Sequence, residues 1–279
     1  MIRKSRGTAS GSLVLCAFLW SSAGILIKLV DWDPFAIAGV RSLLACLVML
    51  VVLGKPRFTF SLDQILAGVT YSATMILFVI ANKMTTPANA VLLQYTSPVY
   101  IIILGHWLLA DEKTSLGDWL IVAGILGGMV LFFFDELTVT ANIGNLLAVL
   151  SGIAFACMTI FMRRQKNNRS ADSFMLAHLL TFFVSIPFII RAGVPSPVSM
   201  GGLALLGILQ IGLPSVLYGW GVSGVSALSA ALITMLEPVL NPVWVVIFTR
   251  ELPSPHTITG GLIILFFVGM RAVLKKEKI

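Results

Sequence analysis

Glu237 is an acidic residue deep in an apolar run, one position before Pro238. A charge at the centre of a bilayer costs about 2.5–3.5 kcal/mol on insertion scales, so this carboxyl is expected to face water or a partner group. The chemistry predicted here is binding of a cationic group on a solute or exchange of a proton. The alternative is a structural carboxyl that is protonated or hydrogen-bonded to a neighbouring helix.

A second proline, Pro98, occupies the matching place in the first half of the chain, 140 residues before Pro238. Each proline frees the carbonyl four residues earlier, that of Gln94 or of Thr234. In lipid a freed carbonyl is tolerated only where protein or water covers it, so both helix kinks are predicted to face an interior. The two carbonyls would suit an ammonium or amide group. The alternative for Gln94 and Thr234 is interhelical hydrogen bonding, worth about 0.6 kcal/mol on average.

Deep aromatic side chains complete the candidate substrate-binding set, because they can stack on a ring or a cation. Packing is their commoner fate, so two or three are expected to touch a solute. They are Trp20, Tyr71, Tyr95, Tyr218 and Trp244. Trp32, Trp107 and Trp119 lie near span ends and are expected in the interfacial belt. His106 and His178 are expected to pack rather than to relay protons.

The composition indicates an integral membrane protein. Hydrophobic residues make up 58% of the 279 residues and charged residues 11%, against about a quarter charged in soluble domains. The runs 84–110 and 252–270 contain no Asp, Glu, Lys or Arg, and about 20 such residues cross a bilayer as a helix. A membrane β-barrel is excluded, because its strands alternate polar and apolar residues. The three cysteines fall inside spans, where a thiol behaves as a small apolar group, so neither a disulfide, a metal nor a cofactor is expected.

Hydropathy and turn signals predict ten transmembrane helices. They are 10–30, 34–53, 62–82, 86–109, 116–134, 142–162, 172–191, 199–221, 225–249 and 256–273. Three begin with a capping side chain directly before a proline: Asp33–Pro34, Thr86–Pro87 and Ser254–Pro255. The loops are short, which leaves no room for a nucleotide-hydrolysing domain.

Positive charges predict the orientation of these helices. With a cytoplasmic N-terminus, 14 Lys and Arg residues flank the spans inside and 4 outside, with Arg41 within a span, as the positive-inside rule requires. Both termini are therefore predicted to be cytoplasmic, in the inner membrane, with an uncleaved first span. The net charge of +7 is spread over membrane flanks, so no nucleic-acid partner is expected.

The chain is predicted to be duplicated. LCAFLWSSAGI at 15–25 aligns with LLAVLSGIAFA at 146–156, and the two proline segments align with each other. Each half, 1–135 and 136–279, would hold five helices. An odd number of spans per repeat inverts the second copy, so the expected fold is two inverted five-helix repeats around a central cavity.

NAVLLQYTSPVY followed by LLADEKTS, and SAALITMLEPVL followed by FTRELPS, resemble the paired repeats of the EamA-type branch of the drug/metabolite transporter superfamily. The resemblance covers nearly the whole chain and implies ten helices and the export of amino acids, metabolites or drugs, although some relatives take solutes up. Glu112 and Glu251 match the family's acidic residue after each proline helix, and Arg41 matches its basic residue in the second helix.

The predicted function is that of a secondary carrier that exports small organic solutes by alternating access. Uptake of an amino acid or an organic cation is the runner-up, and a non-transporting scaffold or a channel-like protein is a third possibility. An enzyme is not expected, since the spans offer no Ser/His/Asp set. The chain is expected as a monomer or homodimer in the bilayer, with the GxxxG of Gly124 and Gly128 favouring packing within the chain.

Overall fold

In the computed structural model, all regular secondary structure in the described part of the chain is helical. The described residues are 6–22, 26, 30–137, 142–165, 170–250 and 252–274. The α-helices are α1 (Arg6–Trp20), α3 (Pro34–Leu53), α4 (Leu62–Met84), α5 (Pro87–Gln94), α6 (Ser97–Leu108), α7 (Leu116–Phe132), α8 (Asn142–Arg164), α9 (Ser170–Ala192), α10 (Pro197–Leu205), α11 (Leu213–Gly221), α12 (Ala227–Thr234), α13 (Leu236–Thr249) and α14 (Pro255–Leu274). Three short segments of other helical type are η1 (Phe134–Glu136), η2 (Leu206–Gly212) and η3 (Val222–Gly224).

Each predicted span coincides with one helix, or with one interrupted helix, to within a few residues; the first, 10–30, is described only in part. Among the described residues, eight helical stretches are long and apolar enough to cross a membrane, and α1 and α7 are shorter apolar helices. The chain is thus a multi-pass membrane protein. A total of ten crossings stays a prediction.

The three predicted proline-associated helix starts are confirmed. Asp33 accepts hydrogen bonds from the backbone of Phe35 and Ala36 at the start of α3. Thr86 accepts from Asn89 at the start of α5, and Ser254 accepts from Thr257 at the start of α14. Each oxygen satisfies an amide that the first helical turn leaves unpaired.

Both proline helices are interrupted where the sequence predicts a kink. The first stops at Gln94 and resumes at Ser97, and the second stops at Thr234 and resumes at Leu236. In each case the break lies just before the proline, at the carbonyl that the proline cannot pair.

A third interruption, η2, was not predicted within the span 199–221. Here the pairing shifts by one residue, so that Leu213 N–H donates to the Ile208 carbonyl. The sequence cause is Pro214, which cannot donate to the Gln210 carbonyl, and the wider π-helical turn absorbs the mismatch.

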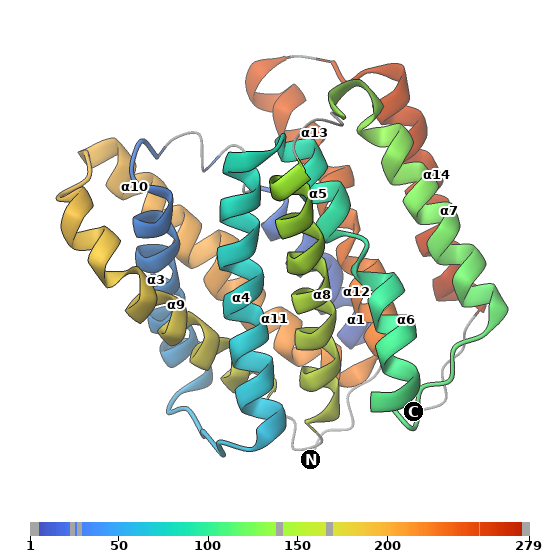
Figure 1. Ribbon diagram of the computed structural model, residues 1–279, viewed down its shortest axis with the longest axis horizontal. Helices are drawn as coiled ribbons and strands as arrows, with labels where there is room; N and C mark the ends of the chain where they lie inside the picture. Colours follow the sequence, from blue (N-terminus) through green and yellow to red (C-terminus); the bar gives the residue numbers. More distant parts are fainter. Residues whose placement is uncertain are drawn as a thin grey trace.

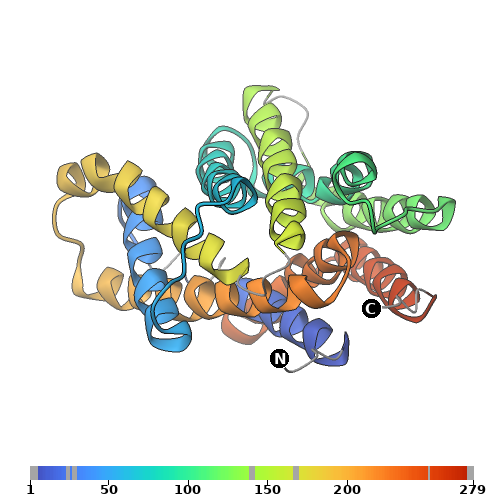
Figure 2. The same ribbon diagram turned by 90° about the horizontal axis from the view of Figure 1, so that it is seen from below.

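The helices form a central bundle with two flanking groups (Figures 1 and 2). In the middle, α4 packs against α8 and α9. On one side, α3 packs against α9 and η2, and on the other α7 pairs with α14. The start of α1 and the end of α14 lie at the same end of the molecule (Figure 1).

The α7–α14 pair is held by glycine contacts and a buried ion pair. Gly128 lies against the Gly260 carbonyl, and Gly124 lies against the ring of Phe267. At the other end of the pair, Arg271 contacts Asp118 at 2.7 Å, with side chains only 4% and 2% exposed. The expectation that the GxxxG motif packs within the chain is therefore confirmed.

We predict that Gly260→Ala destabilises the protein, because the added methyl group would meet the backbone of Phe132 and Gly128. Overpacking of this kind costs about 1–3 kcal/mol. The measurement is the midpoint of thermal unfolding in detergent. Gly269→Ala is the matched control on the same helix, since a methyl group there meets nothing within 4 Å. Equal midpoints for the two variants would contradict the packing argument.

Candidate functional site

A cavity of about 400 Å³ lies where the two halves of the chain meet. It falls within the range of about 300–1,000 Å³ typical of small-molecule sites. Its walls come from α1, α3, α4 and the α5–α6 break in the first half and from α8, η2 and α13 in the second. The lining residues are Trp20, Val30, Trp32, Pro34, Ile37, Arg41, Tyr71, Thr74, Met75, Phe78, Val79, Gln94, Tyr95, Ser97, Phe155, Gln210, Ile211 and Glu237.

Tyr95 and Glu237 join the two helix breaks across this cavity. The Tyr95 hydroxyl donates to Glu237 Oε2 at 2.6 Å, a short distance typical of a charge-assisted bond. The same hydroxyl lies 3.5 Å from the Thr234 carbonyl, which Pro238 leaves without its usual helical donor. One phenol therefore contacts both polar groups of the second break.

Gln94 has a structural contact as well as a place in the cavity wall. Its side-chain amide donates to Ser151 Oγ at 2.9 Å, and that hydroxyl donates to the Thr74 carbonyl at 3.1 Å. The Gln94 carbonyl lies against Gly152, where a side chain would come within 2.8 Å of the oxygen. The backbone of α8 therefore lies close to this carbonyl, and contact of the carbonyl with a solute stays a prediction.

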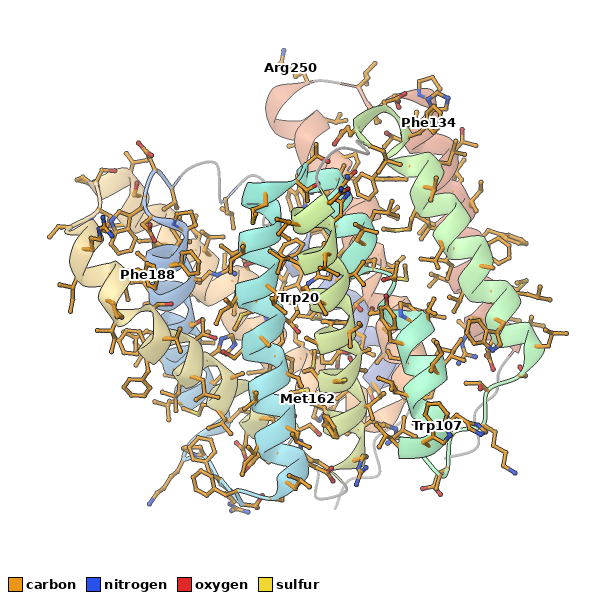
Figure 3. All side chains as sticks on the ribbon, in the orientation of Figure 1. Trp20, Trp107, Phe134, Met162, Phe188 and Arg250 are labelled. Atoms are coloured by element: carbon orange, nitrogen blue, oxygen red, sulfur yellow. The ribbon has the colours of Figure 1, made fainter. Side chains whose placement is uncertain are left out.

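The predicted aromatic residues divide between the wall and its support. Trp20 and Tyr71 line the cavity and are 6% and 5% exposed, and Figure 3 shows Trp20 in the middle of the bundle. Trp20 stacks on Tyr218 with ring centroids 5.6 Å apart. Trp32, which was expected in the interfacial belt, also lines the cavity, and its place relative to the belt stays a prediction. Its indole nitrogen donates to the Ala192 carbonyl at 3.4 Å, which holds the ring against the bundle.

Three predicted site residues lie outside the cavity wall. Tyr218 is fully buried and shares a hydrogen bond of 2.8 Å with Thr159. The Thr234 hydroxyl bonds within its own helix, so only the carbonyl of this residue approaches the site. The Trp244 indole donates to Ser21 at 2.8 Å. The side-chain contacts of Tyr218, Thr234 and Trp244 are therefore those of packing residues.

His178 also packs, as expected. It is fully buried, and its ring nitrogens lie 2.8 Å from Ser215 Oγ and 3.4 Å from Ser42 Oγ.

Two wall residues with an unpartnered polar atom were absent from the predicted set. Arg41, noted in the sequence only for its family match, has no partner for its Nε atom. Gln210, on η2, is 6% exposed, and its Oε1 atom also has no partner. An intramembrane charge was a usable signal for Arg41, and Pro214 was one for the irregular helix that carries Gln210.

The cavity extends toward the start of α3. At the other end of the bundle, which holds the chain termini, ion pairs between side chains connect the helices. Glu112 accepts from Arg163 at 2.7 Å and from the Ala227 amide at 2.8 Å. Arg164 pairs with Asp63 at 3.0 Å. A polar hollow of about 510 Å³ lies among these residues. Glu251, the second acidic residue noted in the sequence, lies outside the described residues.

Helices able to span a membrane and a partly open, mostly apolar cavity define a helical membrane protein with an internal site. The EamA-like transporter family matches the chain twice, over residues 9–134 and 142–271. The chain belongs to this family. It is a transporter, not an enzyme.

Similar proteins cover nearly the whole chain. YwfM, a transporter of Bacillus subtilis (strain 168), is 24% identical over 95% of this chain and 94% of its own. The pseudopaline exporter CntI of Pseudomonas aeruginosa (strain PAO1) is 24% identical over 90% and 91%. Human solute carrier family 35 member G1 is 25% identical over 89% and 74%. A solved crystal structure has the same fold, with a TM-score of 0.82 at 18% identity over 98% of this chain and 100% of that chain.

We predict that Tyr95 and Glu237 stabilise the fold as a pair. In a double-mutant cycle, Tyr95→Phe and Glu237→Gln should show a coupling energy of about 1.5–3 kcal/mol, as expected for a hydrogen bond to a charged group. The measurement is the free energy of unfolding in mixed micelles. Tyr218→Phe combined with Glu237→Gln is the control, because the Tyr218 hydroxyl bonds to Thr159. A Tyr95 coupling no larger than the control value would refute the pairing.

Proposed function

We propose that this transporter is a secondary carrier that exports small organic solutes and binds them in the cavity between its halves. The observation that supports this most is that both interrupted helices meet at one solute-sized cavity, joined by Tyr95 and Glu237. Discontinuous helices that expose backbone and polar groups near the midplane are how many carriers build a solute site. A scaffold protein has no need of such breaks.

Alternating access is the proposed mechanism. The two halves, 1–135 and 136–279, are taken as inverted repeats that rock about the cavity. Support comes from the unequal ends of the bundle: the cavity extends toward Trp32, while ion pairs of Glu112 and Asp63 tie the opposite end. Opening that end would require these pairs to separate. Both pairs are partly exposed, which keeps the cost of separating them low.

The proposed location is the inner membrane, with both termini in the cytoplasm. The support is the excess of Lys and Arg at the end that holds the termini. In this orientation the cavity faces away from the cytoplasm, as it would in a step of solute release. Export is also the activity for which one relative, the pseudopaline exporter CntI, is named.

Glu237 is the proposed solute-binding and coupling residue. Its carboxylate lines the cavity, where it can contact a cationic group or take up a proton. Tyr95 orients it through the 2.6 Å hydrogen bond. Trp20 and Tyr71 supply aromatic surface on the same wall.

The test is transport into and out of proteoliposomes with a panel of amino acids and organic cations, with and without a pH gradient. Right-side-out and inside-out protein populations are distinguished by protease cleavage at the termini, so that direction is measured as well. Movement of no panel member above empty liposomes would contradict the proposal.

Glu237→Gln is predicted to lower transport about 10–100-fold, or to abolish its dependence on the pH gradient, because the amide can neither ionise nor bind a proton at this pH. The control is Glu136→Gln, which alters an exposed carboxyl outside the cavity wall. Unchanged rate and unchanged pH dependence would remove Glu237 from the mechanism.

A further inference from the structure

Arg41 presents a cation to the cavity without a matching anion from the protein. Its side chain lines the cavity from α3, and its Nε atom has no hydrogen-bond partner. No ion pair joins Arg41 to Glu237, or to any other acid in the part of the chain that the structure describes. A partly buried guanidinium without a partner is costly, so an anionic group from outside the chain would satisfy it.

Gln210 supplies a second unsatisfied group to the same cavity. It is 6% exposed, and its Oε1 atom has no partner. Its segment lies directly on α3: the Cα region of Gly207 approaches Leu44 and the Arg41 carbonyl too closely for a side chain. The unpartnered oxygen is an acceptor, so Gln210 would bond to an anionic group through the N–H donors of its amide, which can turn to present either end to the cavity.

Glu237 gives the cavity an opposite charge elsewhere on its wall. It belongs to α13 and is bonded to Tyr95, whereas Arg41 belongs to α3. The rest of the wall is mostly apolar, with Trp20, Met75, Phe78, Phe155 and Ile211 among its members.

We infer that the solute is a zwitterion with an apolar body, such as an apolar α-amino acid, whose carboxylate is bound by Arg41 and Gln210 and whose ammonium group faces Glu237. A purely cationic solute would leave Arg41 unpaired and repelled. A purely anionic solute would leave Glu237 unpaired and would be repelled by it. This inference rests on the proposed function and narrows its solute class.

The first test needs no variant. Binding to the purified full chain is measured by quenching of tryptophan fluorescence, since Trp20 and Trp32 line the cavity, and by calorimetry. The probes are L-phenylalanine, L-leucine and L-methionine, each beside an amine-only analogue (2-phenylethylamine for phenylalanine) and an acid-only analogue (3-phenylpropionate). We expect at least one zwitterion to bind about tenfold or more tighter than both of its analogues.

The second test assigns the carboxylate to its partner. Arg41→Gln and Gln210→Leu should each weaken binding of the preferred zwitterion, by about 10–100-fold for Arg41, and change binding of its amine-only analogue by less than about threefold. Glu237→Gln should weaken both ligands. Arg57→Gln is the control, with the same loss of charge on an exposed residue outside the cavity wall.

Amine-only ligands that bind as tightly as their amino acids, or a panel in which no zwitterion binds, would overturn the inference. So would equal losses for both ligands in Arg41→Gln, which would indicate a structural role. Transport of amines as fast as of amino acids would overturn the inference and leave the carrier function in place. Selective zwitterion binding without transport would overturn the carrier function and leave the inference about the solute in place.

Discussion

The need to satisfy backbone carbonyls inside an apolar bundle is the constraint on which this structure depends. Pro98 and Pro238 each remove one donor from a helix, and lipid offers no replacement. The two freed carbonyls have different neighbours at the two breaks. Gly152 brings the backbone of α8 over the first freed carbonyl, and the Tyr95 hydroxyl approaches the second. Both breaks are thereby fixed at the junction of the halves.

That junction determines where the cavity can form. Because Tyr95 also holds Glu237, the acid stays beside the second break and not against lipid. The third irregularity, η2, has the same origin in a proline and carries Gln210, which lines the same cavity. Three local losses of helical pairing therefore converge on one polar-edged cavity, while the regular α7–α14 pair remains outside it.

Membership of the EamA-like family establishes transport, and the arrangement of charges adds chemistry to it. Arg41 and Glu237 line one cavity without neutralising each other. At the end of the termini, by contrast, Glu112 and Arg163 do neutralise each other. The paired charges of Glu112 and Arg163 suit a contact between helices that can form and separate. The separated charges of Arg41 and Glu237 suit a binding site for a ligand that carries both signs of charge.

The sequence by itself determined the class, the approximate helix positions and the breaks before Pro98 and Pro238, because composition, run length and proline act locally. The break at η2 was found only in the structure. The sequence also drew attention to Tyr95 and Glu237, since an intramembrane acid beside a proline is unusual at any position. Only tertiary structure decided which deep aromatic residues face the cavity. Trp20 and Tyr218 have similar sequence settings, yet one lines the wall and the other supports it from behind. The rotation of each helix is set by packing against its neighbours, which hydropathy alone does not encode. The same holds for Arg41 and Gln210, whose common cavity depends on two segments far apart in the chain.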